Sequence, residues 1–192
     1  MKIQIHRYLN RTKMAGPGWR FCIWVQGCSR RCENCMAKET WLHNDGSAMD
    51  TEELLKQIVA VPDIEGVTFL GGEPFEQPRA VALLAQGVKN SGLSVVTFTG
   101  FTIEELSSQS NPYVQYLLKV TDLLIDGPFI EDKFSLNRPW VGSSNQRFQF
   151  LTERYNENDL IGVRNQVEIR ITPNGKTLIN GMCDFSKIKG LL

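Results

Sequence analysis

Between residues 50 and 127 the sequence alternates short apolar segments with longer amphipathic ones, which restricts the possible folds more than any other feature. The short segments have the length and composition of buried strands: Gly66–Leu70, Leu93–Thr99 and Asp122–Ile125. Apolar residues at helical spacing predict helices between them: Thr51–Val61 with Asp50 as its N-cap, Arg79–Asn90, a short helix from Ile103, and Tyr113–Lys119. Strands and helices that alternate in this way form right-handed βαβ units around a parallel sheet. The sequence therefore predicts an α/β fold.

The two ends of the chain are predicted to add strands to this arrangement. Alternating apolar and polar residues indicate four of them: Lys2–Tyr8, Trp19–Val25, Gln166–Thr172 and Lys176–Asn180. The last two flank a Pro-Asn-Gly turn at residues 173–175, and an Asn-Gly pair between two strands is typical of a β-hairpin. We expect residues 1–150 to form one domain and residues 151–192 to form an extension that carries the hairpin and packs on that domain.

Glycine turns follow three of the predicted strands. Gly71, Gly100 and Gly127 come at or just after the ends of the strands in the alternating region. The carboxyl ends of parallel strands lie at one edge of the sheet, and ligands of β/α folds bind there. The predicted strand Trp19–Val25 is followed by a loop rich in cysteine, so we expect this loop to face the same edge.

Three of the five cysteines lie within eight residues, as Cys28, Cys32 and Cys35 in a C-x3-C-x2-C pattern. The odd number of cysteines argues against a disulfide framework and favours a metal site. Three thiolates would leave one iron of a [4Fe-4S] cluster free to bind a ligand, since a fully ligated cluster needs four. The alternative is a structural zinc site with a fourth ligand from Cys22 or His43. The loop by itself favours the cluster without excluding zinc.

Bulk composition restricts the partners of the protein. Lys plus Arg equals Asp plus Glu at 21 each, so no excess of charge indicates nucleic acid or an anionic membrane as a partner. No apolar run is long enough to span a bilayer, and the charged N-terminal residues do not resemble a secretory signal. We therefore expect a cytoplasmic protein with no nucleic-acid or membrane partner.

The turn Gly71-Gly72-Glu73-Pro74 has the composition of a ligand site. Two glycines allow a ligand to approach the backbone closely, and the Glu73 carboxylate can accept hydrogen bonds from an ammonium group. An ordinary turn between a strand and a helix is the simpler interpretation of the turn alone. The cysteine loop at the same predicted edge favours a shared site.

Together, the cysteine loop and the Gly71-Gly72-Glu73 turn resemble the radical S-adenosylmethionine (SAM) superfamily. Further segments narrow the resemblance to the family of anaerobic ribonucleoside-triphosphate reductase activating proteins, which are glycyl-radical-enzyme activases. These segments are Gly16-Pro17-Gly18-Trp19-Arg20, Gln26-Gly27-Cys28, Glu39-Thr40-Trp41, Thr99-Gly100-Phe101-Thr102, Glu104-Glu105-Leu106, Asp126-Gly127-Pro128-Phe129 and Gly142–Arg147. The resemblance covers roughly residues 14 to 147.

This resemblance implies a partial (β/α)6-type radical SAM barrel with a small C-terminal β-hairpin extension. It also implies the cofactors, a [4Fe-4S] cluster and SAM. By the same resemblance, the cluster ligands are Cys28, Cys32 and Cys35, and the amino end of SAM is bound by Gly71, Gly72 and Glu73. The adenine of SAM would be contacted by the backbone around Asn34 and Met36. The SAM carboxylate or ribose would be contacted by Thr99 and Asp126. Asn145, Gln146 and Arg147 would hold SAM or face the partner. No catalytic residue beyond the cluster ligands is implied.

The resemblance further implies a reaction and a partner. An electron donor such as flavodoxin or ferredoxin would reduce the cluster, and SAM would be cleaved to a 5′-deoxyadenosyl radical. That radical would take a Cα hydrogen from a glycine of a large partner enzyme, an anaerobic ribonucleotide reductase. Three departures keep open a radical SAM enzyme that modifies another peptide or a small molecule: Asn34 where an aromatic residue is common, Met36-Ala37 after the third cysteine, and the tail from Leu151.

Overall fold

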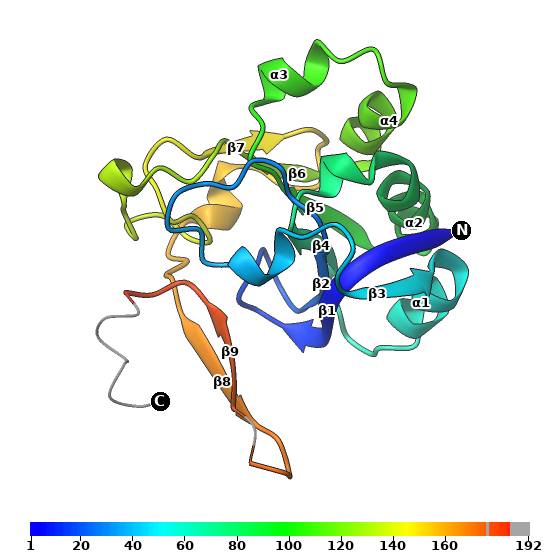
Figure 1. Cartoon of the computed structure of the whole chain (residues 1–192), viewed down its shortest axis with the longest axis horizontal. Helices are drawn as coiled ribbons and strands as arrows, with labels where there is room; N and C mark the ends of the chain where they lie inside the picture. Colours follow the sequence, from blue (N-terminus) through cyan, green and yellow to red (C-terminus); the bar gives the residue numbers. More distant parts are fainter. Residues whose placement is uncertain (176, 185–192) are drawn as a thin grey trace.

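The computed structural model describes residues 1–175 and 177–184, which form a seven-stranded mixed sheet and a separate two-stranded hairpin (Figure 1). The strands of the large sheet are β1 (Lys2–Thr12), β2 (Arg20–Val25), β3 (Ser47–Asp50), β4 (Gly66–Gly71), β5 (Ser94–Phe98), β6 (Leu123–Asp126) and β7 (Arg147–Phe150). The hairpin consists of β8 (Val167–Ile171) and β9 (Thr177–Gly181). The helices are α1 (Thr51–Val59), α2 (Pro78–Asn90), α3 (Ile103–Ser107) and α4 (Pro112–Val120). Short 3-10 turns occur at Lys38–Thr40, Pro74–Glu76, Glu131–Lys133 and Glu157–Leu160.

The strand order in the large sheet is β3-β1-β2-β4-β5-β6-β7. Strands β2, β4, β5 and β6 run parallel to one another, whereas β1, β3 and β7 pair antiparallel with their neighbours. The prediction of an α/β fold is confirmed. In the part of the chain that the structure describes, three β/α crossovers join four parallel strands, which are fewer units than the six that the family resemblance implies.

Local signals in the sequence explain where the helices begin. The Asp50 carboxylate accepts hydrogen bonds from the backbone amides of Glu52 and Glu53 at 2.9 and 3.3 Å, as expected of the N-cap of α1. Thr102 and Glu105 form a reciprocal capping box at the start of α3. The predicted helices are all present with small shifts at their ends. Strands β3 and β7 were not predicted, because each has only four residues and contains no run of β-branched residues.

The two faces of the central sheet are covered by different parts of the chain. Side chains of Phe21, Ile23 and Val25 in β2 pack in one apolar cluster with α1, α2 and α4. Because successive strand residues point to opposite faces, Cys22 and Trp24 lie on the other face. That face is covered by the loop after β6 and by residues beyond 150, which supply a second apolar cluster containing Trp140, Val141, Tyr155, Leu160 and Val163. The helices therefore leave one face of the sheet open to loops.

A buried arginine ties the segment after β7 to the sheet. Arg20 is fully buried, and its guanidinium donates hydrogen bonds to Thr68 Oγ1 at 2.6 Å and to Tyr155 Oη at 3.0 Å. Further bonds go to Ser94 Oγ and the carbonyl of Val67. A buried charge is tolerated only when its donors have partners, so this network fixes Tyr155 against the sheet.

The hairpin projects away from the large sheet (Figure 1). Its turn forms as predicted, with the Gly175 amide donating to the Thr172 carbonyl at 2.8 Å. The predicted start of its second strand, Lys176, lies outside the described residues, and β9 is seen from Thr177. Within the described ranges, no helix has the length and apolarity needed to cross a membrane.

Candidate functional site

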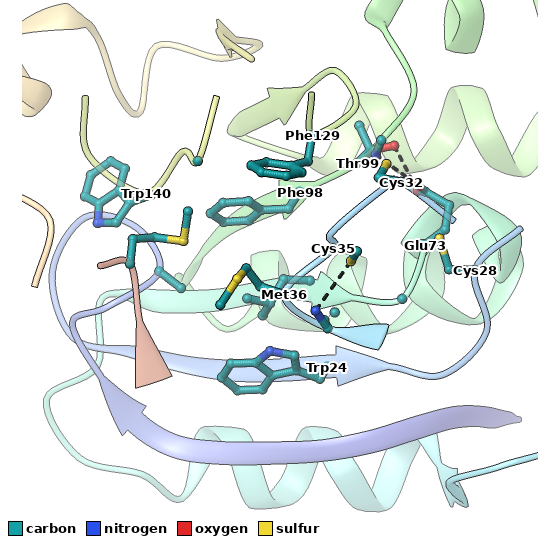
Figure 2. Close-up of a pocket in the computed structure, with 18 of the residues that line it drawn as sticks. Trp24, Cys28, Cys32, Cys35, Met36, Glu73, Phe98, Thr99, Phe129 and Trp140 are labelled. Atoms are coloured by element: carbon teal, nitrogen blue, oxygen red, sulfur yellow. Dashed lines mark hydrogen bonds between the residues drawn. The ribbon is translucent and has the colours of Figure 1, made fainter. Parts of the chain in front are cut away.

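A pocket of about 380 Å³ lies at the carboxyl edge of the parallel strands (Figure 2). The three clustered cysteines line it together with the turn after β4, as the strand-end argument predicted. Its lining includes Cys28, Cys32, Cys35, Met36, Gly71, Gly72, Glu73, Thr99, Gly100, Gly127, Gly142 and Gln146. Segments far apart in the sequence therefore meet at one site.

The backbone of the loop that carries the cysteines is hydrogen-bonded mainly at its two ends. The Gly27 amide donates to the Thr40 carbonyl at 2.7 Å, and the Cys28 amide donates to the Trp41 carbonyl at 3.1 Å. Between these points, the Cys35 amide donates to the Cys32 carbonyl at 3.1 Å. All three thiols are free and partly exposed, and burial raises the pKa of Cys28.

Neither candidate for a fourth zinc ligand joins the three cysteines. Cys22 is fully buried among apolar side chains outside the pocket, and burial raises the pKa of its thiol to about 12. His43 is half-exposed, and its Nε2 lies 2.6 Å from Glu76 Oε2. Among the residues described, no three His, Cys, Asp or Glu side chains surround a point that one metal ion could occupy. A [4Fe-4S] cluster has its irons at separate corners, so three thiols bordering one open pocket fit such a cluster.

The Gly-Gly-Glu turn and the cysteine loop are joined through their backbones. The Gly72 amide donates to the Val25 carbonyl at 2.9 Å, and the Glu73 amide donates to the Gly27 carbonyl at 2.8 Å. A Cβ atom at Gly72 would lie 2.5 Å from Gly27 O, closer than real contacts allow. Glycine is therefore required at 72 because the start of the cysteine loop packs directly against it. The two motifs are one structural unit.

The Glu73 carboxylate is 1% exposed and accepts three hydrogen bonds. The donors are the amides of Phe75 at 3.0 Å and Gly100 at 2.8 Å and the Thr99 hydroxyl at 2.8 Å. Burial raises the pKa of Glu73 to about 7, and these three donors act in the opposite direction by favouring the ionised form. Glu73 thus links the turns after β4 and β5 and presents a carboxyl group in the wall of the pocket.

Some of the predicted site residues lie elsewhere. Asn34 adopts a left-handed backbone conformation with φ 51°, and its side-chain amide donates to Glu131 rather than lining the pocket. Asp126 is fully buried and does not line the pocket; it accepts a hydrogen bond from the Ile103 amide at 2.7 Å and pairs with Arg147. Met36 and Thr99 do line the pocket.

The Gly142–Arg147 segment mainly organises its own loop. Gln146 Oε1 accepts a hydrogen bond from the Gly142 amide at 2.9 Å, and both residues line the pocket. The Asn145 amide group donates to the Pro128 carbonyl at 2.7 Å. Arg147 forms ion pairs with Glu104 and Asp126, and the hydrogen bonds it donates to Glu104 lower the pKa of that carboxyl group to about 2. The segment therefore ties the loop after β6 to the start of β7.

Several lining residues were not predicted from the sequence. Trp24, Phe98, Phe129 and Trp140 give the pocket an aromatic lining, with the cysteines toward one end and Trp140 toward the other (Figure 2). Arg7 also lines the pocket, and its guanidinium lies 3.8 Å from the centre of the Trp24 ring. The strand alternation that places Phe21 and Ile23 against the helices could have identified Trp24 as facing the other side.

Comparison with known proteins defines the class of the protein and then its family. A family profile described as a 4Fe-4S single cluster domain matches residues 14–149. The anaerobic ribonucleoside-triphosphate reductase-activating protein of Vibrio cholerae is 32% identical over 150 residues, which are 73% of this chain and 94% of that protein. Its counterpart in Escherichia coli is 29% identical over the same shares of both chains. The chain therefore belongs to the radical SAM family of anaerobic ribonucleoside-triphosphate reductase-activating proteins.

A viral protein and a solved structure also match the chain. The activating protein of Enterobacteria phage T4 is 30% identical over 138 residues, covering 69% of this chain and 84% of the phage protein. Among solved structures, QueE from Escherichia coli matches with a TM-score of 0.41 and 23% identity, covering 53% of this chain and 54% of that chain. Membership in the family makes the protein a radical SAM enzyme, with a [4Fe-4S] cluster and SAM as its cofactors.

Proposed function

We propose that this protein is an activase that installs a glycyl radical on a partner enzyme, an anaerobic ribonucleotide reductase. The observation that carries the proposal is the single unit formed by the cysteine loop and the Gly71-Gly72-Glu73 turn at one pocket. The relatives are named for activating an anaerobic reductase, and they match over nearly their whole length. An electron donor such as flavodoxin or ferredoxin would complete the system in the cytoplasm.

In this proposal each group of pocket residues has a defined task. Cys28, Cys32 and Cys35 would hold the cluster, which together with SAM supplies one-electron chemistry that removes a hydrogen atom from the substrate. Glu73 would accept hydrogen bonds from the ammonium group of SAM, with the backbone of Gly72 beside it. Met36 and the aromatic lining would exclude water.

The proposed site lies in a partial radical SAM barrel. We assign residues 1–150 to this barrel domain and residues 151–192 to an extension packed on it. Two hydrogen bonds support this packing. One joins Arg20 in the sheet to Tyr155, before the hairpin, and the other joins Thr12 in the sheet to Glu168 in the hairpin.

Radical formation on the reductase tests the proposal. The protein is reconstituted with iron and sulfide without oxygen, reduced, and mixed with SAM and a candidate reductase. Electron paramagnetic resonance should then detect a glycyl radical, and Cys32→Ala should abolish both the radical and 5′-deoxyadenosine. Cys183→Ala is the matched control and should retain both, since Cys183 does not line the pocket. Normal SAM cleavage by Cys32→Ala would contradict the assignment of the cluster ligands.

The second candidate function is a radical SAM enzyme that modifies a different peptide or a small molecule. It is favoured by one observation: residues Ile179–Met182 of the extension border the pocket, so the site is more enclosed than the shared domain alone would make it. Wild-type protein that forms 5′-deoxyadenosine, yet leaves every candidate reductase without a radical, would favour this function.

A further inference from the structure

The root of the C-terminal hairpin reaches the cofactor pocket. Four consecutive residues at and just after the end of β9, Ile179–Met182, line the pocket together with Cys28, Cys35 and Glu73. These four residues lie outside the segment 14–149 that the family profile matches. One wall of the pocket is therefore supplied by a part of the chain beyond the family domain.

A buried hydroxyl group holds this hairpin root in position. Thr12, at the end of β1, is fully buried and donates a hydrogen bond to Glu168 Oε2 at 2.7 Å. The side-chain amide of Asn180 donates to the Thr12 hydroxyl oxygen at 3.1 Å. Since Glu168 lies in β8 and Asn180 in β9, one hydroxyl connects the sheet to both strands of the hairpin. Its loss would remove the hydrogen bonds that join β1 to Glu168 and Asn180 and so weaken the hold on the root beside the pocket.

The hairpin root also contacts the loop on the other side of the pocket. A Cβ atom at Gly142 would lie 3.0 Å from Met182 Cε and 3.2 Å from the Phe129 ring. Glycine at 142 therefore leaves room for the end of the Met182 side chain beside Phe129. This contact connects the hairpin root to the Gly142–Arg147 segment, whose Gln146 also lines the pocket.

The wall formed in this way is largely apolar. Ile179 and Met182 share the pocket with Trp24, Phe98 and Trp140. Trp24 and Trp140 are almost fully buried, at 5% and 6% exposure, and the hairpin root borders the same pocket as these two rings. An apolar cover over a reactive site keeps water and other hydrogen donors away.

We propose that the hairpin root, Ile179–Met182, is the substrate-side wall of the pocket and couples SAM cleavage to hydrogen removal from the substrate. The proposal rests on the proposed radical SAM activity. In one coupled turnover the donor gives one electron and SAM yields methionine and 5′-deoxyadenosine. The hydrogen atom gained by 5′-deoxyadenosine comes from the substrate glycine, which becomes the radical. Met182 is then a residue that positions the substrate segment, and Asn180 holds the hairpin root in place through Thr12.

The coupling ratio tests this role. Thr12→Val keeps the shape of the buried side chain and removes the hydrogen bonds to Glu168 and Asn180. We expect the amount of 5′-deoxyadenosine formed per glycyl radical to rise at least threefold in this variant. The matched control, Thr177→Val, makes the same change on an exposed part of β9 and should leave the ratio unchanged. If Thr12→Val lowers 5′-deoxyadenosine and the glycyl radical by the same factor, the proposal is overturned, because a purely structural role lowers both together.

A second measurement uses the wild-type protein and does not depend on turnover. The cluster-loaded protein is kept oxidised, so that SAM binds without being cleaved, and amide hydrogen exchange is followed over residues 177–182. Exchange there should slow at least threefold when SAM is added, because the ligand fills the pocket beside these residues. Unchanged exchange at 177–182, with slower exchange at the Gly71–Glu73 turn, would overturn the hairpin wall. The exchange result does not depend on whether any reductase acquires a radical. Radical formation on the reductase separately tests the proposed function.

Discussion

The two motifs that border the pocket differ in how firmly the protein holds them. The turn at Gly71–Glu73 borders the pocket on one side and is bonded to the sheet on the others, with buried Glu73 accepting three hydrogen bonds and the half-buried Gly72 donating its amide to β2. The loop from Cys28 to Cys35 is partly exposed, and its backbone is bonded mainly at its ends. Its side-chain contacts, such as Ser29 with Glu76 and Arg30 with Glu105, lie at the surface. The side of the pocket proposed to bind SAM is therefore organised by the protein itself. The cysteine side depends more on what the cysteines bind, since ordering a loop costs backbone entropy that a bound cluster can offset.

Replacing Gly72 should give the largest effect, because it breaks the contact between the two motifs. In Gly72→Ala the new Cβ would lie 2.5 Å from Gly27 O and 2.8 Å from Val25 O, so backbone must shift. We expect the free energy of unfolding to fall by about 2–4 kcal/mol in urea titrations. Gly92→Ala is the control, since φ is +79° there but nothing lies within 4 Å. It should cost about 1 kcal/mol from backbone strain alone. Equal losses in the two variants would mean that the contact is unimportant.

The buried Glu73 should make stability depend on pH. Its pKa in the folded protein is raised to about 7, above the value in an unfolded chain, so its contribution is fully present below about pH 4.5. That contribution is lost as the pH rises through about 7, because ionisation of a buried carboxyl group is costly. Relative to Glu73→Gln, we expect wild type to lose about 2 kcal/mol of unfolding free energy between pH 5 and pH 8. A constant difference between the two proteins across this range would show that Glu73 titrates normally.

Removing the cluster should loosen the cysteine loop and leave the Gly-Gly-Glu turn unchanged. After chelation without oxygen, amide exchange over residues 28–37 should accelerate by about tenfold, an effect of about 1.4 kcal/mol. Exchange over residues 71–75 serves as the internal control, because the hydrogen bonds there come from protein groups. Equal acceleration in both segments would remove the distinction between them.

A smaller effect is expected at the contact that supports the first turn of the cysteine loop. Glu76 Oε1 accepts hydrogen bonds from the Ser29 amide at 2.8 Å and hydroxyl at 2.5 Å, and Glu76 Oε2 lies 2.6 Å from His43. These contacts lower the pKa of the Glu76 carboxyl group. Glu76→Gln keeps one acceptor and removes the charge, so we expect the cluster to be lost about twofold faster on exposure to chelator. The same change at exposed Glu52 should leave this rate as in wild type, whereas a faster loss there would indicate a general charge effect.

Much of the fold could be predicted because its signals are local. Cap residues such as Asp50 and the apolar spacing in α1, α2 and α4 act within a few positions of the chain, so helices and parallel strands were found near their true ends. The edge that carries the pocket followed from the glycine turns after parallel strands. Short strands such as β7 were not predicted, because their own residues show no strong preference for a strand. Strand β7 forms because it pairs with β6.

The sequence by itself determined the α/β alternation, the cysteine spacing, the Gly-Gly-Glu turn and the family, since each depends on residue types at fixed short separations. Only the tertiary structure decided which side chains face the pocket. Asp126 turns to Arg147 on the neighbouring strand and Asn34 turns to Glu131, because a polar side chain takes whatever partner the fold brings within reach. Polar contacts that form only in the folded protein also hold the hairpin root at the pocket. Thr12 meets Glu168 and Asn180 across more than 150 positions of sequence, and no local pattern encodes that contact.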